Sequence, residues 1–161
     1  MKIINEVQGS QGWHEHRTKS FNASDAPAML GISKYKSRSD LLKERATGIM
    51  PEIDDATQQR FNNGHRFEAL ARTLAEIIVE DDLSPVVGAD GQLSASFDGI
   101  NFRQTVIYEH KTLNANIRRD MGINGNTGGL DEMYRAQMEQ QLMISGAEKC
   151  LFMASTWDDQ D

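Results

Sequence analysis

The chain has 161 residues, of which 39% are hydrophobic and 25% charged, a composition typical of a globular protein rather than a disordered or membrane one. Its formal net charge of −7 argues mildly against a protein that holds nucleic acid by overall positive charge, although residues 34–45 and the pair Arg118 and Arg119 are locally basic. No apolar run approaches the roughly 20 residues that cross a bilayer, and the single cysteine, Cys150, excludes a disulfide or a multi-cysteine metal site within one chain.

These limits favour a single domain over residues 1–161 with one active site. The first six residues lack the apolar segment of a secretory signal, so we expect a cytoplasmic protein without a membrane partner.

Two short helices are predicted in the first 50 residues. Ser24 has the position of an N-cap for a helix over residues 24–31, which carries Pro27 in its first turn and ends at Gly31. A second helix is expected from about residue 39 to residue 47, closed by Gly48.

Residues 57–80 have the spacing of a long amphipathic helix. Apolar residues recur there at intervals of three and four, as in Phe67, Leu70, Ala71, Leu74, Ile77 and Ile78. Gly64 lies inside this stretch and weakens the pattern locally.

The second half of the chain predicts a β-meander followed by a helix and a last strand. The expected strands are 83–87, 93–97 and 105–112, with turns at Gly88–Gly91 and at Asp98 and Gly99; a mobile loop over 113–130, a helix over 131–145 and a strand over 149–156 follow. This order predicts an α/β or α+β domain whose central mixed β-sheet is flanked by helices.

Asp98 and the run Glu109-His110-Lys111 carry the chemistry. Side chains two apart on a strand share a face, so Glu109 and Lys111 lie side by side, and Asp98 reaches the same side if its strand is the neighbour. Two carboxylates about 4 Å apart repel by about 4 kcal/mol at an effective dielectric of about 20, unless a proton or a cation separates them. Oxygen ligands without cysteine or histidine support indicate Mg²⁺, or Mn²⁺ in its place. The alternative is a solvated surface pair of Glu109 with Lys111, which is common for an arbitrary Glu-x-Lys.

Several segments in one order resemble the YqaJ-like viral recombinases, the lambda exonuclease family of the PD-(D/E)XK nuclease superfamily. The resemblance covers nearly the whole chain and rests on these segments: Trp13-His-Glu-His-Arg17, Asn22-Ala-Ser-Asp25, Gly64-His-Arg-Phe-Glu68, Ser96-Phe-Asp98-Gly99, Glu109-His-Lys111 and Tyr134-Arg-Ala-Gln137.

This resemblance implies a role for each matching residue. Asp98 and Glu109 would bind the metal directly, Glu68 directly or through water, and Lys111 would be the catalytic lysine. Gln137 matches a glutamine near the attacking water, with Gln140 and Gln141 as alternatives one turn of register away; a satisfied core glutamine is the structural alternative.

A site for the 5′-phosphate of DNA is also implied, at Arg17 and Ser24. A helix start and an arginine fork both suit an anion. The alternatives are an ordinary N-cap for Ser24 and a surface charge for Arg17. Trp13 would stack on DNA or pack the N-terminal helix against the domain.

The resemblance therefore implies a Mg²⁺-dependent deoxyribonuclease that degrades double-stranded DNA from a 5′ end during phage-type recombination in a bacterial cell. The alternatives are an endonuclease of the same superfamily, and an inactive truncated remnant that only binds DNA or a partner. Implied partners are DNA ends, a single-strand annealing protein and further copies in a trimer. The chain stops soon after its last expected strand, whereas lambda-type enzymes continue, so the trimer stays an open expectation here.

Overall fold

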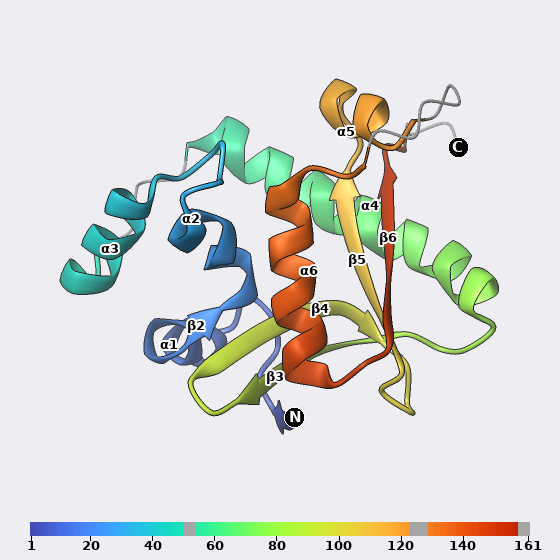
Figure 1. Cartoon of the computed structure of the whole chain (residues 1–161), viewed down its shortest axis with the longest axis horizontal. Coiled ribbons are helices and arrows are strands. Elements are labelled where there is room, and N and C mark those ends of the chain that lie inside the picture. The colour runs from blue at the N-terminus through green and yellow to red at the C-terminus, as the bar shows by residue number, and fades with distance from the viewer. Residues whose placement is uncertain (50–53, 123–128, 158–161) are drawn as a thin grey trace.

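The structure is a computed structural model that describes residues 1–49, 54–122 and 129–157, and it is built around a six-stranded sheet (Figure 1). The strands run in the order β1-β3-β4-β5-β6, and β2 pairs with β4 beside this path. Pairing is antiparallel from β1 through β5 and parallel between β5 and β6, so the predicted mixed sheet is confirmed. The bounds are β1 Lys2–Ile4, β2 Phe21–Asn22, β3 Ser84–Asp90, β4 Leu93–Ile100, β5 Val106–Thr112 and β6 Lys149–Ser155.

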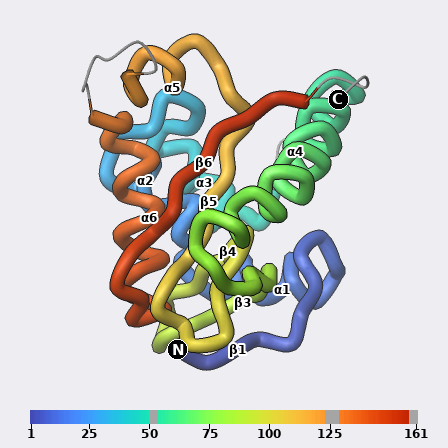
Figure 2. Tube along the Cα trace, turned by 90° about the vertical axis from the view of Figure 1, so that its right-hand side faces the viewer, coloured from blue at the N-terminus to red at the C-terminus, as the bar shows by residue number. Residues whose placement is uncertain are grey.

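Two helices cover opposite faces of this sheet. Ile144 of α6 packs in one apolar cluster with Phe97 and Ile107, whereas Ala75 of α4 packs in another with Leu83 and Tyr108. Figures 1 and 2 show α6 on one side of β5 and β6 and α4 on the other. The helices are α1 Gln11–Lys19, α2 Ala26–Leu30, α3 Arg38–Thr47, α4 Asp55–Val79, α5 Ala115–Asp120 and α6 Glu132–Ser145, with a 3₁₀ turn at Ala23–Asp25. Of the helices in the described ranges, none is long and apolar enough to cross a membrane.

The long helix and its neighbours follow their sequence signals closely. The side chain of Asp54 accepts a hydrogen bond from the backbone N–H of Thr57 and starts α4, which continues through Gly64 without a break. Gly48 and Gly146 end α3 and α6 with positive φ, as their positions predict.

The predicted N-cap at Ser24 is wrong. Ser24 lies inside the 3₁₀ turn Ala23–Asp25, and α2 itself starts at Ala26 without a side-chain cap. The Ser24 hydroxyl instead accepts a hydrogen bond from the Arg17 guanidinium at 3.0 Å. The hydroxyl is thus directed toward Arg17, seven residues earlier in the chain, rather than toward a backbone N–H of α2, a contact that the local N-cap signal does not reveal.

The predicted turn at Gly88–Gly91 is also wrong over its first three residues, because β3 continues to Asp90. A Cβ on Gly88 would lie 2.2 Å from Sδ of Met1 and 3.0 Å from Cε2 of Phe97. Gly88 therefore makes room for packing against Met1, just before the short strand β1, which the sequence did not reveal.

The predicted loop over 113–130 begins with a helix. Asn114 caps α5 by accepting from the backbone N–H groups of Asn116 and Ile117, and Ile117 is fully buried. One buried apolar residue and one cap are enough to order this turn, although the surrounding composition is that of a loop. Residues 123–128 of the predicted loop lie outside the described residues.

Candidate active site

A β-bulge in β4 sets the position of Asp98. Val86 pairs with Phe97 and Ser84 pairs with Ile100, so the single residue Pro85 lies opposite both Asp98 and Gly99. Such a bulge bends the strand and turns a side chain away from its regular face. Pro85 has no N–H to lose from the ladder, which suits this position.

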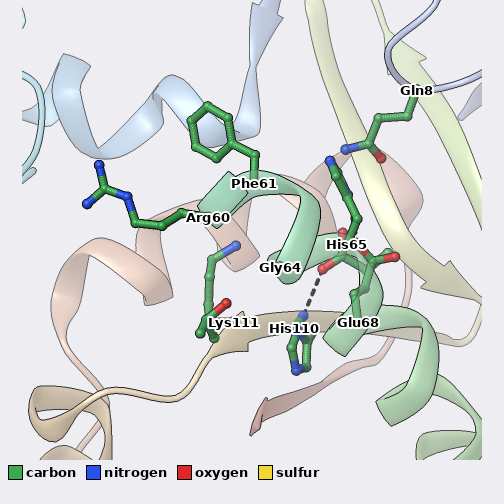
Figure 3. A pocket seen from close by; sticks show the side chains of 10 residues that line it. Gln8, Arg60, Phe61, Gly64, His65, Glu68, His110 and Lys111 are labelled. Carbon is green, nitrogen blue, oxygen red and sulfur yellow. Dashed lines mark hydrogen bonds and ion pairs between the residues drawn. The ribbon is translucent and has the colours of Figure 1, made fainter. Parts of the chain in front are cut away.

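The carboxylate of Asp98 enters the space where β4 and β5 separate. The pairing of these strands ends with Gly99 opposite Tyr108, and the next step of the register brings Asp98 opposite Glu109. There Oδ2 of Asp98 accepts a hydrogen bond from the backbone N–H of His110 at 2.8 Å, drawn as the dashed line in Figure 3. The carboxylate of Asp98 thus takes the place of a backbone carbonyl as the partner of the His110 N–H in β5.

Three side chains contact the buried carboxylate of Glu109, which is only 2% exposed. Oε1 accepts from the amide of Gln137 at 2.6 Å and from the ammonium of Lys111, and Oε2 accepts from the amide of Gln141 at 2.7 Å. Gln140 points elsewhere, because its amide donates to the backbone carbonyl of Phe21. Both Gln137 and Gln141 therefore face the site.

Glu68 reaches the site from α4, on the other side of the sheet from α6. Its Oε1 accepts from Arg72 at 3.1 Å, and its Oε2 lies 3.7 Å from Nδ1 of His65. Figure 3 shows Glu68, His65 and Gly64 on α4 above Lys111 and His110 of β5.

The acidic groups repel one another. Burial, and then the negative charge of Glu109, raise the pKa of Asp98 well above its ordinary value, and burial is also the main reason why the pKa of Glu68 is raised. Burial acts to lower the pKa of Lys111, but the charges of Glu109 and Asp98 outweigh it and leave this pKa raised. The cluster therefore favours a bound positive charge.

The donor set suits a hard divalent cation, since it consists of carboxylate oxygens with excess negative charge. In the described part of the chain no three His, Cys, Asp or Glu side chains converge closely enough to hold an ion as they stand. The reason is that the ammonium of Lys111 and the amides of α6 face Glu109, while Oδ2 of Asp98 faces β5.

Two adjoining hollows bring the predicted residues together. We call them the α4 hollow, of about 250 Å³ and lined in part by Glu68, Asp98 and Lys111, and the α1 hollow, of about 640 Å³. The α1 hollow is lined in part by Arg17, Ser24, Asp98, Glu109, Lys111 and Gln137. Asp98 and Lys111 line both hollows, and each of the seven candidate residues lines at least one of them.

Arg17 is held in place on the wall of the α1 hollow. Its guanidinium lies 4.7 Å from the ring centroid of Trp13 and donates to Ser24, while the indole N–H of Trp13 donates to Oγ of Ser96 at 2.9 Å. Trp13 thus links Arg17 to β4, two residues before Asp98.

Sequence reasoning missed two polar contacts here. Arg72 pairs with Glu68 one helical turn away, a spacing that the sequence contains but that is common on exposed helices. Gln141 was only an alternative register for Gln137, although their spacing of four residues places both on one face of α6.

Comparison with solved structures supports the same architecture. The chain matches the alkaline exonuclease LHK-Exo from Laribacter hongkongensis, solved in complex with dAMP, with a TM-score of 0.69 and 22% identity over 94% of this chain and 76% of that one. It also matches a phage-related exonuclease from Haemophilus somnus 129PT, with a TM-score of 0.55 and 13% identity over 84% of this chain and 68% of that one. At these identities the likeness shows the fold, which is of the PD-(D/E)XK type.

No match to a curated protein was found. Residues 12–148 match the YqaJ-like viral recombinase domain, a span that contains all seven candidate residues and most of the chain. The chain therefore belongs to the family of YqaJ-like viral recombinase domains.

Proposed function

We propose that this chain is a metal-dependent deoxyribonuclease that degrades double-stranded DNA from a 5′ end. The observation that carries the proposal is the meeting of Asp98, Glu109 and Lys111 in one space, with Glu68 beside them. The family supports a nuclease of phage recombination, and the two structural neighbours described above are named exonucleases.

Asp98, Glu109 and Glu68 would hold Mg²⁺, or Mn²⁺ in its place. Such an ion supplies positive charge beside the attacked phosphodiester. Its binding would also relieve the repulsion by Glu109 that, after burial, raises the pKa of Asp98 and of Glu68.

Lys111 has a second task once a divalent cation neutralises Glu109. Its ammonium is then available to orient the attacking water or to donate to a phosphate oxygen on which charge grows. Gln137 supplies a neutral amide on the α6 side, where it can orient the same water without opposing the charge of the phosphate.

Arg17 and Ser24 would bind the terminal 5′-phosphate. They lie on the wall of the hollow that also contains Asp98 and Glu109, so one bound nucleotide end can reach both groups. LHK-Exo, a neighbour of this fold, was solved in complex with dAMP, a nucleoside monophosphate, which supports a comparable subsite here.

The test uses linear duplex DNA labelled at its ends, incubated with the purified chain in Mg²⁺ and then in EDTA. We expect the chain to release label only when Mg²⁺ is present, and to leave covalently closed circles uncut. Cutting of closed circles would indicate an endonuclease of the same superfamily. Binding without cutting in either condition would indicate an inactive DNA-binding remnant.

A further inference from the structure

We propose that Gln141 is a positioning residue that fixes the carboxylate of Glu109 for metal binding. This inference rests on the proposed function, because it assigns Gln141 a task toward the cation that Glu109 would hold. Its basis is the hydrogen bond of 2.7 Å from the Gln141 amide to Oε2 of Glu109.

The contacts of Glu109 divide unequally between its two oxygens. Gln137 and Lys111 both donate to Oε1, whereas Gln141 is the one described side chain that donates to Oε2. Without Gln141, Oε2 keeps no side-chain donor in the described ranges, and the carboxylate can rotate about its last bond. Gln141 therefore determines the plane of the carboxylate.

The chemical nature of the donor matters as well. An amide N–H holds a carboxylate without adding charge, so it leaves the full negative charge of Glu109 for a cation. An arginine or a second lysine at this position would hold Glu109 equally well but would repel the ion. A neutral donor is thus the type of residue that a metal site requires at this place.

Gln141 is costly to bury, which suggests that packing alone does not explain it. It is only 1% exposed, and its Oε1 has no hydrogen-bond partner among the residues that the structure describes. An unpaired buried amide oxygen costs about 1–3 kcal/mol, which an apolar side chain of similar size at this core position would avoid. Because the amide must point its N–H group at Glu109, its oxygen is left without a partner.

Gln140 provides a matched control on the next residue of α6. Its amide donates to the backbone carbonyl of Phe21 at 2.8 Å and does not contact Glu109. Changes at Gln140 and at Gln141 both remove a glutamine from the same helix, and only one of them removes a contact of the candidate metal ligand.

The experiment measures Mn²⁺ binding to the purified, DNA-free chain by isothermal titration calorimetry at one pH. Gln141→Met keeps the length of the side chain and removes the donor; we expect roughly tenfold weaker Mn²⁺ binding, the size of effect typical of groups that orient a metal ligand. Gln141→Asn keeps an amide that is one carbon too short to reach Oε2, and we expect it to weaken binding as well. Gln140→Met should change the affinity by less than about twofold.

A second measurement tests whether Gln141 acts through Glu109. In the Glu109→Gln background, adding Gln141→Met should produce no further loss of Mn²⁺ affinity. Circular dichroism verifies folding of each variant, and the asparagine variant decides the outcome if the methionine variant does not fold. The proposal is overturned if the folded Gln141 variant binds Mn²⁺ as the parent does. If the parent itself neither binds Mn²⁺ nor cuts DNA, the proposed function has failed, which is a different result.

Discussion

Replacing Asp98 by asparagine should stabilise the ion-free protein. The asparagine oxygen can still accept the N–H of His110, so the hydrogen bond to β5 is kept while the negative charge is removed. That charge is unfavourable in the fold, because burial and the charges of Glu109 and Glu68 all raise the pKa of Asp98.

The size of the effect follows from Coulomb's law. At an effective dielectric of about 20, two unit charges about 6 Å apart interact by about 3 kcal/mol. Glu109 and Glu68 repel Asp98 whereas Lys111 attracts it, so one repulsion of this order stays uncompensated. Because solvent screens a half-buried group in part, we expect Asp98→Asn to raise the free energy of unfolding by about 2 kcal/mol. For a chain of this length this corresponds to a rise of about 4–8 °C in Tm.

The sign of the pH dependence follows from the raised pKa. Well below the ordinary pKa of 3.8, Asp98 is protonated in both the folded and the unfolded chain, and the two proteins should be equally stable. As the pH rises, the Asp98 carboxyl loses its proton first in the unfolded chain. The parent therefore loses stability relative to Asp98→Asn until the pH passes the raised pKa of Asp98 in the folded chain.

Thermal unfolding in EDTA at pH 5 to 8, and then in Mg²⁺, measures this difference. In EDTA, the Tm of Asp98→Asn should exceed that of the parent by an amount that grows with pH. Mg²⁺ should raise the Tm of the parent more than that of the variant. The variant should also fail to cut DNA. A variant that is less stable than the parent at pH 8 in EDTA, while still folded, would refute the electrostatic reasoning.

Three further changes test other parts of the site and fold. Lys111→Ala should lower the rate of label release at least 100-fold, the typical effect of losing a donor to developing charge, while calorimetric Mn²⁺ affinity changes little; cutting at the parent rate would contradict its role. Arg17→Ala should slow the degradation of 5′-phosphorylated duplex about 10- to 100-fold, to the rate seen with a 5′-hydroxyl end, and an unchanged preference for the phosphate would exclude Arg17 from that subsite. Gly99→Ala should cost about 1–3 kcal/mol in urea unfolding, because its Cβ would lie 3.0 Å from Cβ of Leu83 and 3.3 Å from Cβ of Tyr108; wild-type stability would mean that the bulge adjusts freely.

Local patterns predicted the elements whose signals are periodic. The apolar repeat of α4, the alternation in β4 and the glycine ends of α3 and α6 all depend on residues near one another in the chain. Gly88 and Ile117 were misread because their environment is made by distant residues, namely Met1 and Phe97 around Gly88 and the protein core around Ile117.

The candidate site could be predicted only in part for the same reason. The Glu-x-Lys spacing is local, and Lys111 does contact Glu109. The bulge that turns Asp98 toward them depends on the pairing of β3 with β4, and no pattern within β4 reveals it. The roles of these residues, and the expected trimer and annealing partner, stay predictions.

The acidic character of the chain is consistent with a DNA substrate once the site is considered as a unit. Glu68, Asp98 and Glu109 come from α4, β4 and β5, so the packing of α4 on the sheet and the pairing of β4 with β5 force their charges together, at a cost that one lysine offsets only in part. An anionic phosphate is repelled from such a cluster until a cation joins it. Metal binding and approach of DNA should therefore be coupled, and the local charge at this junction matters more for substrate binding than the net charge of −7.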